Sequence, residues 1–253
     1  MVVTDFKLRY QGSTLGYVWS LLRPLFLFAI LYEVFVNFLQ LGHDVPHYPV
    51  YLLSGIVLWN FFAEVTSTCV DAIVRRGDLI RKINFPKYVV VISVAASALI
   101  NLLLNSAVIF LFLLLTKVPI GWTALWAPLF IIEILLFALA IGFILSTLFV
   151  RLRDISYIWE VVLQAFFYAT PIIYPLSLVA KRWPELAKAL LLNPVGQAIQ
   201  DIRYNLITHE TLTLHGMTHH WLVNLVPFGI VLAALILAVF LYLKRSPYFA
   251  EEV

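Results

Sequence analysis

Three histidines near the end of the chain are spaced closely enough to hold a metal ion. His215, His219 and His220 lie within six residues of one another, and imidazole is a common metal ligand. All six histidines fall outside the apolar runs of the chain, however, and a polar surface loop is the simpler account. The single cysteine, Cys69, excludes a Cys-based zinc site within one chain. We therefore expect no metal site.

Five carboxylates occur in or beside long apolar runs. They are Glu33, Glu64, Asp71, Glu133 and Glu160. An ionised side chain at membrane depth costs about 3 kcal/mol or more, so such residues are candidates for a function. We expect Glu33 and Glu133, the deepest two, to face the protein interior or to be protonated. Asp71 and Glu160 lie nearer to an edge, where nearby arginines can pair with them.

A short basic segment separates two of the apolar runs. Residues 75–87, RRGDLIRKINFPK, carry five cations around Ile80, Ile83 and Phe85, and Pro86 ends the pattern. The pattern predicts an amphipathic helix of about two turns. A loop that is basic only because it faces the cytoplasm explains the same composition. The sequence contains no Gly-Lys pair, so it has no P-loop of its own with which to hydrolyse a nucleotide.

The uncharged runs define the elements that must position these residues. The chain is 62% hydrophobic and only 12% charged. Residues 89–116 contain no charged side chain, and a helix of that length exceeds the ~30 Å hydrocarbon core of a bilayer. We predict a single-domain, all-α polytopic membrane protein. Its six transmembrane helices are expected at 24–41, 49–72, 88–116, 124–149, 155–175 and 221–243.

The distribution of cations predicts the orientation. Six crossings place both termini on one side, and the positive-inside rule makes that side cytoplasmic. Most lysines and arginines then fall in cytoplasmic segments: Lys7, Arg9, Arg23, Arg75, Arg76, Arg81, Lys82, Lys87, Arg151, Arg153, Lys244 and Arg245.

Two further segments are amphipathic without being long enough to span. Residues 1–23 are expected to form an interface helix, and Pro24 is expected to mark a bend into the first span. The stretch 176–220 is expected to form an external lid of short re-entrant or interfacial helices, because the fifth span ends early at Thr170-Pro171. An ordinary external loop explains that stretch equally well.

The lid is expected to contain two short helices. The first, at 176–192, can carry Lys181, Glu185 and Lys188 on one face, since these residues are four and three apart. Asn193-Pro194 ends it, and a second short helix follows at 195–207.

Five strings of the sequence together indicate a family. They are LRYQGSTLGYVWSLLRPL (8–25), YPVYLLSGIVLWNFF (48–62), DLIRKINFPK (78–87), RDISYIWEVVLQAFFYATPIIYP (153–175) and NPVGQAIQDIRY (193–204). In this order the chain resembles, over nearly its whole length, the permease subunit of bacterial ABC-2 type polysaccharide exporters. These exporters move O-antigen, capsule or teichoic-acid chains.

The resemblance implies the partners of the chain. It implies a homodimer in the bacterial inner membrane, paired with two copies of a separate cytoplasmic P-loop ATPase that binds ATP and Mg. This chain would bind no cofactor of its own and would not be an enzyme. The polymer would arrive on a polyprenyl-diphosphate lipid and pass between the two permease copies, with membrane lipid around them and no nucleic acid involved.

The resemblance also assigns roles to residues. The basic segment would couple the permease to its ATPase through Arg75, Arg76, Asp78, Arg81, Lys82, Ile83, Phe85 and Lys87. The anionic lipid head group would be received near Arg9, Trp19 and Arg23, although these side chains could equally serve as a plain membrane anchor. Aromatic side chains that pack on sugar rings would line the channel: Phe28, Tyr32, Phe35, Phe166, Phe167 and Tyr168. Contact with lipid or with neighbouring helices explains the same aromatic residues.

Other functions remain open on the residues alone. An ABC-2 permease for a drug or other small molecule, or a plain channel, would have similar spans. An intramembrane acyl- or glycosyltransferase would use His209 with Glu210, or His219, as a base. Dependence on a co-expressed ATPase separates the ABC transporters from the enzyme and the channel.

Overall fold

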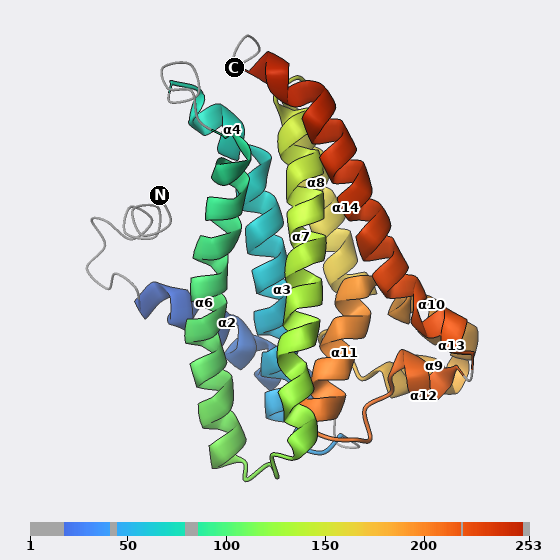
Figure 1. Ribbon diagram of the computed structural model, residues 1–253. Coiled ribbons are helices and arrows are strands. Elements are labelled where there is room, and N and C mark those ends of the chain that lie inside the picture. Colours follow the sequence, from blue (N-terminus) through green and yellow to red (C-terminus); the bar gives the residue numbers. More distant parts are fainter. Residues whose placement is uncertain (1–17, 41–44, 79–85, 219, 250–253) are drawn as a thin grey trace.

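The computed structural model describes residues 18–40, 45–78, 86–218 and 220–249, and within these ranges the secondary structure is entirely helical. The long elements are α2 (Val18–Tyr32) with its π-helical continuation η1 (Glu33–Phe38), α3 (Tyr48–Val70), α6 (Tyr88–Leu115), α7 (Ala127–Phe149) and α14 (Val226–Arg245). Figure 1 shows α3, α6, α7 and α14 running along one another as a bundle.

Shorter helices connect and cover this bundle. They are α4 (Ala72–Arg75), η2 (Trp122–Trp126), α8 (Ile155–Ala169), α9 (Leu176–Arg182), α10 (Pro184–Leu191), α11 (Pro194–Leu206), α12 (Leu214–Met217), α13 (Trp221–Asn224) and η3 (Ser246–Tyr248). Helices α9, α10, α12 and α13 form a side lobe near one end of the bundle (Figure 1).

Five helices of the described chain are long and apolar enough to cross a membrane, at Val18–Phe38, Tyr48–Val70, Tyr88–Leu115, Trp122–Phe149 and Val226–Tyr248. Helix α8 is apolar but has only 15 residues. At about 1.5 Å per residue it is shorter than the hydrocarbon core, so it does not form the full fifth span that we expected over 155–175. The predicted early break at Thr170-Pro171 is confirmed, because Thr170 leaves the helix with an extended backbone.

Helices α8 and α11 lie one after the other along α3. Trp59 and Phe62 of α3 contact α8, whereas Tyr51 of α3 contacts α11. The apolar crossing therefore stops with α8, and the unwound segment 170–175 followed by α9 and α10 connects it to α11, which is not among the apolar helices of the described chain.

Two boundaries differ from the sequence-based prediction because of proline. Pro24 lies inside α2, which begins at Val18, so the helix continues through the position at which we expected the first span to begin. The helix predicted at 176–192 is split at Trp183, since the residue before Pro184 is disfavoured in the α conformation. Lys181 and Glu185 therefore lie on different helices, while Lys188 and Glu185 still pair at 2.7 Å.

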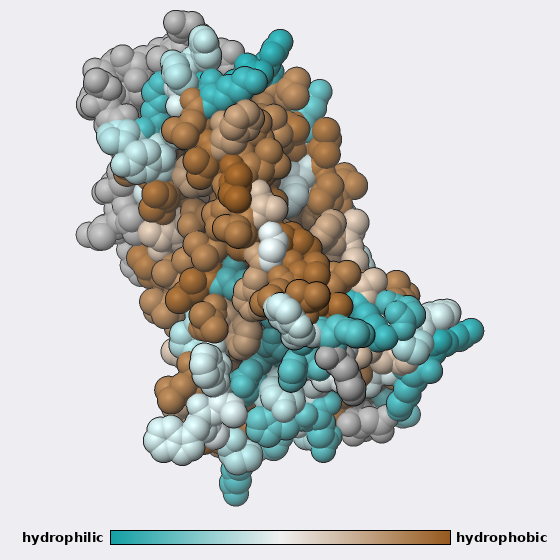
Figure 2. Space-filling model, turned by 45° about the vertical axis from the view of Figure 1, so that its right-hand side comes forward, coloured by the Kyte–Doolittle hydropathy of each residue, from teal (hydrophilic) through white to brown (hydrophobic). Residues whose placement is uncertain are grey.

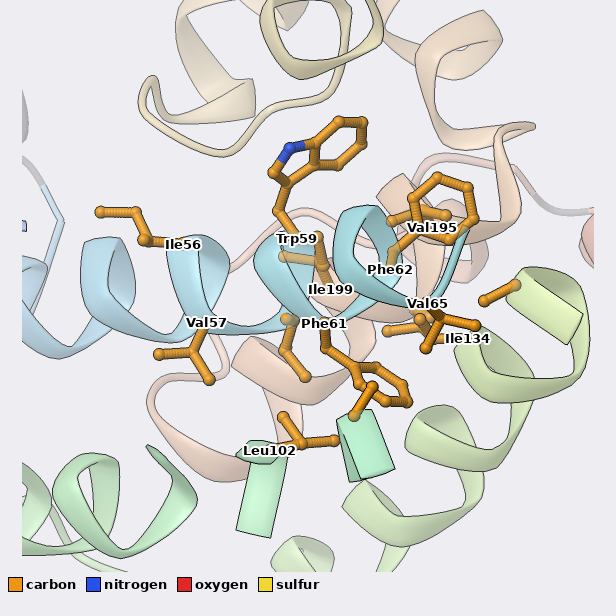
Figure 3. Packing of buried hydrophobic residues seen from close by; sticks show 14 of the residues in the cluster. Ile56, Val57, Trp59, Phe61, Phe62, Val65, Leu102, Ile134, Val195 and Ile199 are labelled. Atoms are coloured by element: carbon orange, nitrogen blue, oxygen red, sulfur yellow. The ribbon is translucent and has the colours of Figure 1, made fainter. Parts of the chain in front are cut away.

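The core is centred on α3. In its most apolar stretch 78% of the residues are buried, against 11% for the first long helix and 22% for the last. Its side chains meet residues of α6, α7 and α11, among them Leu102, Ile134 and Ile199 (Figure 3). Gly142 of α7 permits a close approach between α7 and α3, because a Cβ atom there would lie 2.9 Å from the Cys69 Sγ atom.

The surface agrees with a membrane protein. Figure 2 shows a broad hydrophobic zone between two hydrophilic ends. Side chains such as Phe26, Ile30 and Phe240 are more than half exposed on the outer faces of α2 and α14. Exposed apolar side chains of this kind are at home in lipid or against another copy of the chain.

Candidate functional site: the two ends of the bundle

One end of the bundle carries the basic segment. We call it the loop-bearing end and define it by residues 71–78, 86–87, 150–154 and 244–249. Asp71 pairs with Arg75 at 2.8 Å, which confirms that an arginine neutralises this edge carboxylate. Arg76 Nη1 donates to Ser93 Oγ over 3.4 Å, and Asp78 is exposed. Arg81, Lys82, Ile83 and Phe85, the other predicted coupling residues apart from Lys87, lie outside the described residues.

Lys87 joins the start of α6 to the end of the chain. Its Nζ atom donates to the carbonyl of Ser246 at 2.7 Å and lies 5.8 Å from the centroid of the Phe249 ring. Phe249 is fully buried and packs edge-on against Tyr242 of α14, which in turn packs against Phe143 of α7. The segment after α14 therefore clamps the base of the basic segment to the bundle, a contact that the sequence analysis did not anticipate.

The aromatic residues of α2 pack within the chain. The Phe28 ring lies 5.6 Å from the rings of both Tyr32 and Phe112, and Phe28 is buried. Tyr32 and Phe35 are half-buried against the same core. In a single chain Phe28 packs against α6, and the predicted role of Phe28, Tyr32 and Phe35 in lining a channel stays a prediction.

The aromatic residues of α8 divide between two faces. Phe167 packs edge-on against Trp59 of α3 with ring centroids 5.9 Å apart. Phe166 and Tyr168 are exposed, at 46% and 64%. Glu160 and Gln164 are exposed too, and they share a side of α8 with Tyr168, which follows them by eight and four positions, whereas Phe166 lies on a different side.

Polar side chains join α2, α3 and α6 in a row that we call the polar seam, made up of Ser20, Glu64, Asn101 and Asn105. Asn101 Nδ2 donates to Glu64 Oε1 at 2.7 Å, and Asn105 Nδ2 donates to the carbonyl of Ser20 at 3.3 Å. The seam gives Glu64 a partner inside an apolar bundle. The sequence analysis missed the two asparagines, although their spacing of four in an uncharged run was the available signal.

The predicted residues for the lipid head group begin α2. Trp19 and Arg23 are exposed near the first described turn, while Arg9 lies outside the described residues. Their predicted role at the lipid head group stays a prediction.

The other end of the bundle is organised around Arg203, and we call it the outer end after the orientation that the distribution of cations predicts. This α11 side chain is fully buried. Its Nη1 and Nη2 atoms donate to the carbonyls of Pro171 and Ile172, each at 2.7 Å, and its Nε atom donates to the carbonyl of Tyr51 at 3.0 Å. The guanidinium group also lies 3.6 Å from the centroid of the Tyr51 ring. Burial lowers the pKa of this guanidinium, and the nearby tyrosines Tyr51 and Tyr48 oppose that shift.

The remaining acids and histidines occupy different environments. Glu133 is buried, as predicted, and neither of its carboxylate oxygens has a partner among the described residues. Glu33 is exposed and accepts a hydrogen bond from Asn37, so it does not face the interior of the single chain, which was the first of the two predicted alternatives. His209 packs on Tyr204, and His215 contacts Asn224. Across the described ranges, no three His, Cys, Asp or Glu residues form a group that could hold a metal ion.

A comparison with known protein families places this architecture. Residues 1–207 match the family described as the ABC-2 type transporter. The chain belongs to the ABC-2 type transporter family. As a member of this family it is a transport component with several apolar membrane helices, and it resembles named permeases over most of its length.

Three curated relatives illustrate the resemblance. An O-antigen export system permease protein, RfbA, of Klebsiella pneumoniae is 28% identical over 98% of this ABC-2 chain and 91% of the relative. RfbA of Myxococcus xanthus is 30% identical over 77% of this chain and 74% of the relative. The polysialic acid transport protein KpsM of Escherichia coli is 21% identical over 79% and 77%.

Proposed function

We propose that this chain is the membrane-spanning subunit of an ATP-driven exporter that carries a lipid-linked polysaccharide, most closely an O-antigen, across the bacterial inner membrane. The observation that carries the proposal is the near full-length match to permeases that are named for O-antigen export. A match to a polysialic acid transport protein supports the same substrate class.

The proposal includes partners that drive and complete the transporter. ATP hydrolysis is assigned to two copies of a separate cytoplasmic ATPase, because the chain contains no P-loop. The loop-bearing end would receive the ATPase, and the clamp between Lys87 and the C-terminal segment supplies a rigid base for that contact. A homodimer would cover exposed apolar faces such as that of α2.

Deletion of the gene tests the proposal. We expect the host to lose its surface polysaccharide and to accumulate the lipid-linked polymer inside, because assembly of the polymer does not need the exporter. A plasmid copy should restore export only when the partner ATPase retains its P-loop lysine, which polarises the phosphates of ATP. Normal surface polymer in the deletion strain would instead favour a small-molecule substrate.

Phe166 and Tyr168, two exposed aromatic residues of α8, are our candidates for contact with the sugar chain. We expect Phe166→Ala combined with Tyr168→Ala to reduce export about tenfold, since each aromatic contact is worth about 0.5–1.5 kcal/mol, while basal ATPase activity stays unchanged. Phe228→Ala combined with Phe240→Ala, two exposed residues of α14, is the matched control and should export normally. Equal export by both double variants would exclude α8 from the polymer path.

A further inference from the structure

The break after α8 creates a problem that the fold must solve. Residues Thr170, Pro171, Ile172 and Ile173 are buried although they are not helical, so their carbonyl groups lack the partners that a continuing helix would provide. Buried backbone carbonyls in a membrane protein need such partners.

Arg203 provides hydrogen-bond donors for two of these four carbonyls with one side chain. Its fork of N–H groups satisfies the carbonyls of Pro171 and Ile172 and at the same time reaches the carbonyl of Tyr51 on α3. A guanidinium group suits this task because it presents several donors in a fixed plane, and charged donors form the stronger hydrogen bonds. The unwound segment is thereby tied to both α3 and α11.

Two neighbouring contacts secure the same segment. The Tyr48 hydroxyl donates to the carbonyl of Ile173, and Asn193 Nδ2, at the beginning of α11, donates to Thr170 Oγ1 at 3.2 Å. The lobe beyond has a small core of its own, formed by Leu176, Ala187, Leu191 and Leu214. Segment 170–173 is therefore the part of the main core from which the chain passes into the smaller core of the lobe.

Gly55 makes room for the arginine. A Cβ atom at this position would lie 2.1 Å from Arg203 Nη2 and 3.2 Å from the carbonyl oxygen of Ile172. Only a residue without a side chain lets the guanidinium group lie between α3 and the broken helix. Gly229 on α14 has no atom within 4 Å of its added Cβ and serves as a matched control.

We propose that Arg203 is the positioning residue that keeps the outer end of the bundle closed, by fixing the unwound segment 170–173 against Tyr51 and Gly55 of α3. The proposal rests on the proposed function in one respect, which is that the outer end is where the polymer leaves. Opening this end by movement of the segment away from α3 requires the bonds of the Arg203 guanidinium group to break, together with the Tyr48 hydrogen bond to Ile173.

Thiol reactivity of full-length protein in lipid nanodiscs tests this role. The reporter is Ile172→Cys in a Cys69→Ala background, because Ile172 is fully buried in the structure. We expect Arg203→Gln and Gly55→Ala each to raise the reaction rate of this thiol with a polar maleimide by about tenfold, through local opening. Arg203→Lys should give a smaller increase, and Gly229→Ala none.

Native Cys69 provides the control for general unfolding. It is fully buried near the opposite end of α3, and we expect its reactivity in the Arg203→Gln and Gly55→Ala variants to stay within about twofold of the unchanged protein. An unchanged rate at position 172, or an equal increase at Cys69, would overturn the proposal. Failure of the unchanged chain to restore export in the deletion strain would count against the proposed function alone. The thiol rates do not depend on that result, because they are measured without the polymer.

Discussion

Asp201 shows how burial changes the pKa of a single residue. It lies on α11, half-buried, and accepts a hydrogen bond from Gln197. Burial raises the pKa of this carboxyl from 3.8 to about 6, although the Gln197 hydrogen bond and the nearby His215 act in the opposite direction. The folded protein therefore holds the Asp201 proton more tightly than the unfolded chain does.

The sign of the pH effect follows from this raised pKa. The contribution of Asp201 to stability is complete below pH 3.8 and is lost as the pH rises through about 6. We expect Asp201→Asn, which cannot ionise, to raise the thermal unfolding midpoint at about pH 8 more than at about pH 5. Melting curves in detergent at the two pH values measure this difference. Glu185→Gln, at an exposed residue, is the control, and equal gains for Asp201→Asn at both pH values would contradict the assignment.

The segment after α14 acts as a structural element although it is short. Residues Ser246–Tyr248 form a single 3₁₀ turn, and Phe249 inserts behind it against Tyr242 and Lys87. This turn links the last long helix to the first residues of α6, which are far apart in the sequence. Lys87 is thus held by α6 and by the segment after α14 together.

Replacing Phe249 tests this link. Phe249→Ala removes a fully buried ring, a change that costs about 3 kcal/mol in well-packed sites and should release the segment from the bundle. We expect faster removal of C-terminal residues by carboxypeptidase and reduced export with normal membrane insertion. Tyr248→Ala, at the adjacent exposed position, should change neither measurement. Identical digestion of the two variants would show that the clamp is unimportant.

The whole molecule has two chemically different ends separated by a hydrophobic zone (Figure 2). α4 and the end of α14 share one end of the bundle, and the side lobe lies toward the other (Figure 1). If the loop-bearing end is cytoplasmic, the lobe with Arg203 at its base faces the outside of the cell. The positive-inside rule favours this orientation.

Cysteine labelling of intact cells decides the orientation. In a Cys69→Ser background we expect a cysteine at Glu185, exposed on α10, to react with a membrane-impermeant maleimide from outside. A cysteine at Arg153, exposed at the loop-bearing end, should react only after the cells are opened, because the reagent cannot cross the bilayer. The reverse pattern would invert the proposed topology.

Features that depend on neighbours along the chain could be predicted from the sequence alone. Run lengths without charge predicted the long helices, Thr170-Pro171 predicted the end of α8, and the nearby arginines predicted a partner for Asp71, which is Arg75. These features follow from helix rise, proline geometry and short-range pairing, which need no knowledge of the fold.

Tertiary packing alone sets which residues meet across the bundle. It leaves Phe28 buried and Tyr168 exposed, and it places Pro24 inside α2. It also brought Arg203 to carbonyls of residues 51, 171 and 172, which are 152, 32 and 31 positions away. A backbone carbonyl is the same in every residue, so no pattern of side chains can identify the one that a distant arginine will reach. Packing of the helices identifies it, because packing alone determines which buried carbonyls come within reach of a distant donor.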